Sequence, residues 1–113
     1  MTLSMGGEYG EHMDYDALAE RARPALITAA MRRTPLTYGE LGRALDLDAN
    51  LPLPHHINRV LNTVSQRCIA AGEPSLTVIV VNQQTGEPGP GFQAGAVPWY
   101  EEARQCYRHW SPV

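Results

Sequence analysis

The segment LTYGELGRAL, at residues 36–45, narrows the possible folds because it specifies where a helix begins and how the chain enters it. Thr37 is placed as an N-cap and Glu40 follows three residues later, which is the spacing of a capping box. Leu36 before the cap and Leu41 at the fourth helical position form the pattern of a hydrophobic staple. We therefore expect a short helix to begin after Thr37. Its core-facing side chains are predicted to be Tyr38, Leu41, Ala44 and Leu45.

A longer helix is predicted on each side of this short one. Apolar residues at helical spacing indicate a first helix over about residues 14–33, in which Pro24 should cause a kink or a division into two shorter helices. Residues 46–54, DLDANLPLP, are predicted as a turn. Pro54 suits the first position of a third helix, which should end near residue 71 because Gly72 favours a helix C-terminus.

The predicted third helix has two chemically different sides. Its apolar stripe comprises Ile57, Val60, Leu61, Val64, Cys68 and Ile69. Its opposite side presents His55, Asn58, Arg59, Asn62, Thr63 and Gln66. Groups of this kind can contact base edges in a DNA groove, and the face lacks the Glu and Lys of an ordinary solvated helix.

The chain after the third helix predicts a strand, a loop and a last helix. SLTVIVV, at residues 75–81, is rich in β-branched residues, and NQQTGEPGPGF, at 82–92, has the Gly/Pro content of a hairpin tip. Pro98 is expected to open a final helix whose aromatic stripe packs on the core. The fold class predicted is α+β, mainly α: a winged helix-turn-helix with a small β-hairpin wing and an extra C-terminal helix. The 113 residues suit one domain at 14–113, preceded by a flexible acidic tail at 1–13.

Charge is distributed unevenly along the chain. Residues 1–20 carry five acids and no Arg, whereas residues 21–72 carry seven Arg and three acids, within a formal net charge of −3. Arg suits bidentate contacts to phosphate and guanine, although a GC-rich genome also favours Arg, and solvated helix faces explain the same residues. We expect phosphate contacts alone to give modest affinity.

One family has a similar motif order. TYGELGRAL resembles the "(S/T)Y-x-x-L-A" helix of the alkylguanine-DNA alkyltransferases and alkyltransferase-like proteins. INRVL then falls where these proteins place a DNA-inserted helix, and TVIVVNQQTG where they carry "PCHRV" and a glycine wing, so the likeness covers about residues 35–92. The resemblance implies that Tyr38 contacts the DNA backbone at a flipped nucleotide and that Arg59 or Asn58 fills the vacated stack.

The same resemblance does not extend to alkyl transfer. The position of the nucleophilic cysteine falls near Thr77 and that of the following histidine near Val78, so neither partner of an activated thiolate is present. The adjacent His55 and His56 point about 100° apart on a helix and do not suit one metal ion. We therefore expect no enzyme activity, no metal and no cofactor.

The sequence leaves two functions open. The first is a non-catalytic DNA-binding protein that recognises double-stranded DNA. It would read modified or damaged DNA, as the alkyltransferase resemblance implies, or act with a restriction or defence nuclease. The second role is implied by VVNQQTGEPGPGF, which resembles the strand and wing of small bacterial and phage winged-helix domains, some of which accompany restriction-type nucleases. The alternative is a winged-helix adaptor that binds a protein partner or a second copy of itself without DNA.

The DNA-binding interpretation assigns three groups of residues. The base-facing group is Asn58, Arg59, Asn62, Thr63 and Gln66. The phosphate-binding group is Tyr38, Arg43, His55 and Arg67, and the wing group is Gln83, Gln84 and Thr85. A cytoplasmic location away from membranes is expected, because the longest apolar run, at 76–81, is too short to span a bilayer and the N-terminus lacks a secretion pattern.

Overall fold

The computed structural model describes residues 13–48, 52–89 and 97–112. Its elements in chain order are α1 (Tyr15–Met31), β1 (Leu36–Thr37), α2 (Tyr38–Ala44), α3 (Leu53–Ala71), the 3-10 helix η3 (Leu76–Ile79), β2 (Val80–Val81) and α4 (Trp99–His109). These residues form a mainly helical fold with a small parallel sheet, which confirms the predicted α+β, mainly α class. The predicted acidic tail up to residue 12, the middle of the predicted turn and the end of the Gly/Pro-rich segment lie outside the described ranges.

Helix α1 is one continuous helix that runs through Pro24. Asp14 caps it, since its carboxylate accepts a hydrogen bond from the Ala17 N–H at 3.0 Å. Leu26 and Ala22 are fully buried, whereas Pro24 lies on the exposed side. The prediction of a helix over this segment is confirmed, and the chain forms one helix in place of two shorter ones.

The segment predicted as one strand, residues 75–81, divides into two elements. Only Val80 and Val81 form a strand, which pairs in parallel with Leu36 and Thr37. Leu76–Ile79 form the 3-10 helix η3, and all four of its side chains are buried. The strand prediction was therefore wrong for most of the segment, because β-branched residues also suit a buried non-strand segment.

Helix α2 begins where the sequence predicts. The Thr37 N–H donates to the Glu40 carboxylate at 2.9 Å and the Glu40 N–H donates to the Thr37 hydroxyl at 3.1 Å, which completes the capping box. Leu41 and Leu45 are buried, as predicted. Ala44 is exposed, contrary to the prediction, because it lies to one side of the stripe that these two leucines form.

Helix α3 ends at Ala71 in a Schellman motif. The Gly72 N–H donates to the Ile69 carbonyl at 3.1 Å, the Glu73 N–H donates to the Cys68 carbonyl at 2.9 Å, and Gly72 has φ 71°. Pro54 occupies the second helical position instead of the first. The predicted C-terminus of this helix is therefore confirmed.

The buried stripe of α3 differs from the prediction at one position. Ile69 is 74% exposed, because it lies one turn beyond Gln66 on the solvent side, and the prediction that it is buried was wrong. His56 is buried instead, together with the five predicted residues Ile57, Val60, Leu61, Val64 and Cys68.

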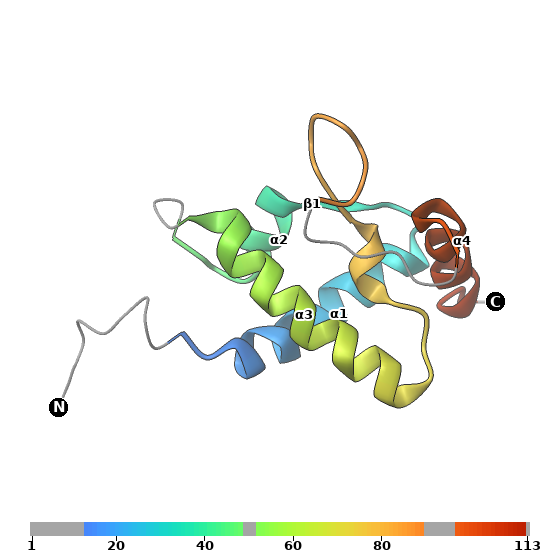
Figure 1. Ribbon diagram of the computed structural model, residues 1–113, viewed down its shortest axis with the longest axis horizontal. Helices are drawn as coiled ribbons and strands as arrows, with labels where there is room; N and C mark the ends of the chain where they lie inside the picture. The colour runs from blue at the N-terminus through green and yellow to red at the C-terminus, as the bar shows by residue number, and fades with distance from the viewer. Residues whose placement is uncertain (1–12, 49–51, 90–96, 113) are drawn as a thin grey trace, which may run out of the picture.

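The helices surround one core, with α3 lying across α1 (Figure 1). The chain after β2 projects from the body as a loop near β1, and α4 packs at the end away from the start of α3 (Figure 1). As predicted, α4 follows Pro98, and the aromatic residues Trp99, Tyr107 and Trp110 pack against the core, in which Ala103 and Cys106 are buried. None of the described helices is both long and apolar enough to cross a lipid bilayer.

Candidate nucleic-acid interface

The side of α3 away from the core carries polar side chains in contact with solvent. His55, Arg59, Asn62 and Gln66 are exposed along this side, while the neighbouring Asn58 and Thr63 are half-buried. The 19 residues of α3 contain no Asp or Glu. The helix therefore presents hydrogen-bonding groups and positive charge without a carboxylate of its own.

Four of the predicted DNA-binding residues line one groove. His55, Arg59, Asn62 and Thr63 form its α3 side, and Tyr15 from the first turn of α1 forms the other. The groove has a volume of about 430 Å³. Sequence reasoning missed Tyr15, because only the crossing of α1 and α3 brings it beside Arg59, and no local pattern reports that crossing.

Aromatic rings contact one another and Arg59 beside the groove. The Arg59 Cζ atom lies 4.7 Å from the centre of the Tyr15 ring. The Tyr15 hydroxyl hydrogen bonds the Nδ1 atom of His56 at 2.8 Å. Burial lowers the pKa of His56, and the charges of His55 and Arg59 lower it further. His56 therefore favours the neutral imidazole, in which Nδ1 either accepts from the Tyr15 hydroxyl or donates to it, depending on the tautomer.

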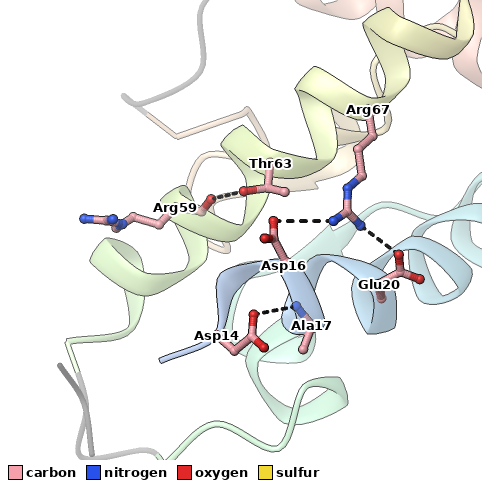
Figure 2. Close-up of polar contacts among 7 residues, drawn as sticks. All are labelled: Asp14, Asp16, Ala17, Glu20, Arg59, Thr63 and Arg67. Carbon is pink, nitrogen blue, oxygen red and sulfur yellow. Dashed lines mark hydrogen bonds and ion pairs between the residues drawn. The ribbon is translucent and has the colours of Figure 1, made fainter. Parts of the chain in front are cut away.

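Arg67 lies further along α3 and is paired with acidic residues of α1. Its guanidinium lies 3.4 Å from the Asp16 carboxylate and 3.2 Å from that of Glu20. Figure 2 shows both carboxylates reaching up from α1, while the Arg59 side chain points away from them. The predicted phosphate contact of Arg67 would therefore have to compete with two carboxylates.

Tyr38 occupies the first position of α2 and contacts the base of the loop after β2. It is half-buried, and a Cβ atom added to Gly89 would overlap its hydroxyl and lie 2.7 Å from its Cζ atom. Burial raises the pKa of Tyr38, and a hydrogen bond with the Gly89 backbone acts in the opposite direction. Arg43, at the other end of α2, is exposed.

We call residues 82–89 the hairpin loop, because Val81 and Pro88 form an antiparallel bridge across its base. The Asn82 side-chain oxygen accepts hydrogen bonds from the Gln84 and Thr85 N–H groups at 2.7 and 3.3 Å, which tightens the turn. Gln84, Thr85 and the neighbouring Gln83 are exposed. These three predicted residues lie on the hairpin loop and do not line the groove.

The cysteines are buried as thiols. Burial raises the pKa of Cys106 to about 12 and also raises the pKa of Cys68. Within the described ranges, His, Cys, Asp and Glu form no group of three or more placed to hold a metal ion. Cys68 and Cys106 thus contribute to packing at neutral pH.

Comparisons of the chain with protein-family models, curated proteins and solved structures found no match.

Proposed function

We propose that the protein binds double-stranded DNA without catalysing a reaction, as a winged helix whose recognition helix is α3. The observation that carries this proposal is the division of α3 into a buried aliphatic side and an exposed side of Arg, His, Asn and Gln without a carboxylate. The order helix, strand, helix, helix, strand, hairpin loop supports the winged-helix assignment.

The exposed polar groups of α3 match hydrogen-bonding groups of DNA. Arg59 can donate two hydrogen bonds to guanine, and Asn62 or Gln66 can pair with adenine through its side-chain amide. His55, in the first turn of α3, would contact a phosphate, which the positive end of the helix dipole favours. Arg43 and the exposed tip of the hairpin loop would contact the flanking backbone.

The test is the affinity of the purified protein for a labelled duplex, measured by fluorescence anisotropy at low salt. Arg59→Ala is expected to cost about 1–3 kcal/mol of binding free energy, as for a direct base contact. Arg104→Ala removes the same charge from an exposed position on α4 and is expected to leave the affinity nearly unchanged. The wild-type affinity should fall steeply as salt is added, because phosphate contacts release counterions.

The absence of duplex binding at low salt, or equal losses in the two variants, would contradict the proposal. Duplexes with alkylated or mismatched bases, and single-stranded DNA, form further arms of the same titration. Tighter binding to an altered duplex would support the narrower proposal that the protein reads modified or damaged DNA, which the alkyltransferase resemblance motivates.

A second candidate function is protein binding through the same side of α3. It is favoured by Ile69, which is 74% exposed and extends the row of Asn62 and Gln66 with an apolar side chain. This function predicts a dimer or complex in sedimentation measurements that Ile69→Asn dissociates, in a protein that does not bind DNA.

A further inference from the structure

We propose that Tyr15 is a positioning residue of the DNA interface, which holds the Arg59 guanidinium over its ring and makes the first turn of α1 part of the binding site. This inference rests on the proposed function, and it adds a residue from another helix to the α3 surface.

The guanidinium of Arg59 lies over an aromatic ring instead of beside a carboxylate. Arg67 pairs with Asp16 and Glu20, and Arg23 pairs with Glu73, whereas the ion pairs among the described residues do not include Arg59. Its Cζ atom lies 4.7 Å from the centre of the Tyr15 ring. A cation over a ring is attracted to the ring face, and its N–H groups stay free to donate in the guanidinium plane.

The Tyr15 ring is itself fixed in place. Its hydroxyl hydrogen bonds His56 Nδ1 at 2.8 Å, and the two ring centres lie 6.1 Å apart with an interplanar angle of 23°, so the rings meet end to end through this hydrogen bond. His56 is only 6% exposed, so the Tyr15 ring is anchored by a hydrogen bond to a buried residue. Asp14 caps α1 directly before Tyr15 and fixes the backbone from which the ring extends.

This arrangement matters for binding because a long exposed side chain loses conformational freedom when it contacts a ligand. An Arg whose guanidinium already rests on a fixed ring loses less of that freedom on binding. The groove between Tyr15 and α3 then presents Arg59 beside Asn62 and Thr63 in one orientation. Tyr15 therefore acts on DNA through Arg59.

The first experiment is a double-mutant cycle on duplex affinity. Tyr15→Leu is expected to weaken binding by about two- to fivefold, the range for an exposed cation–ring contact. In the Arg59→Ala background, the same substitution should have almost no effect. Tyr15→Phe keeps the ring and should retain most of the affinity, and Tyr100→Leu, at an exposed tyrosine on α4, is the matched control. Equal losses from Tyr15→Leu with and without Arg59 would overturn the inference.

The second experiment needs no DNA. In the free protein, the Arg59 Nε–H resonance should carry a ring-current shift in the ¹H–¹⁵N NMR spectrum that Tyr15→Leu removes and Tyr100→Leu leaves. A protein that binds DNA but shows no such shift would refute the role of Tyr15 while leaving the proposed function intact. A protein that shows the shift but binds no duplex would refute the proposed function, and the positioning role with it.

Discussion

Arg59 and Arg67 lie on the same helix but have different surroundings. Arg59 rests on a tyrosine ring, while Arg67 bridges Asp16 and Glu20, whose side chains are 82% and 75% exposed. Ion pairs this exposed contribute little to stability. Their larger effect is on the electrostatic potential of α3, because they place two negative charges beside the proposed DNA-binding side.

Removing these two charges should strengthen DNA binding. We expect Asp16→Asn combined with Glu20→Gln to raise duplex affinity about threefold at low salt, because Arg67 becomes free for a phosphate and two repulsive charges disappear. Anisotropy titrations measure the change, and the gain should shrink as salt is added. Glu101→Gln, which frees Arg104 on α4 in a similar way, is the control. An affinity that falls in the double variant would show that the acids support the interface instead of weakening it.

At the scale of elements, α2 and the hairpin loop meet where the Tyr38 side chain lies against Gly89. The Tyr38 side chain occupies the position that a Cβ atom of residue 89 would take, so any side chain there must displace it. Tyr38, which the alkyltransferase resemblance assigns to the DNA backbone, thus also contacts the base of the hairpin loop. A substitution of Gly89 should therefore affect both the position of Tyr38 and that of the hairpin loop.

We expect Gly89→Ala to destabilise the fold by about 1–3 kcal/mol, because the added methyl group must displace Tyr38. Urea unfolding measures this loss. Gly39→Ala is the matched control, since its nearest neighbour would lie 3.8 Å away in ordinary contact. Within helix α2 that substitution should be neutral or stabilising by about 0.5–1 kcal/mol. Equal stability of the two variants would mean that the loop base moves aside without cost.

The sequence predicts elements best where the signal is local. The capping box at Thr37 and the glycine at position 72 place two helix ends correctly, because each pattern works within a few residues. The pairing of β1 with β2 joins distant parts of the chain, and no local pattern announces it. For the same reason the sequence did not indicate Tyr15, because only the crossing of α1 and α3 brings Tyr15 to the groove.

At the scale of the whole molecule, one partly buried ion pair joins three parts of the chain. Arg23 of α1 donates two hydrogen bonds to Glu73, directly after α3, at 2.8 and 2.7 Å. The same guanidinium lies 5.5 Å from the centre of the Trp110 ring, just beyond α4. The hydrogen bonds and charge of Arg23 lower the pKa of Glu73, although burial acts in the opposite direction.

This pair should make the stability of the fold depend on acid pH. A carboxylate whose pKa is lowered by folding stabilises the fold above its ordinary pKa of 4.5, and that stability is lost as pH falls through the lowered value. Glu73→Gln should therefore reduce the free energy of unfolding at pH 7 and flatten its decline below about pH 4.5. Urea unfolding at a series of pH values measures both effects. Glu87→Gln, at an exposed position of the hairpin loop, is the control, and an unchanged acid profile in Glu73→Gln would contradict the prediction.

The short parallel sheet has a consequence for how related chains could diversify. Leu36 and Thr37 lead directly into α2, and Val80 and Val81 lead directly into the hairpin loop, so their pairing ties the origins of these two elements together. Insertions or deletions in the connection between α2 and α3 can then change the tilt of α3 without changing the spacing from α2 to the loop. Such a fold could change the orientation of α3 through the length of the α2–α3 connection, while the β1–β2 pairing keeps the distance between α2 and the hairpin loop constant.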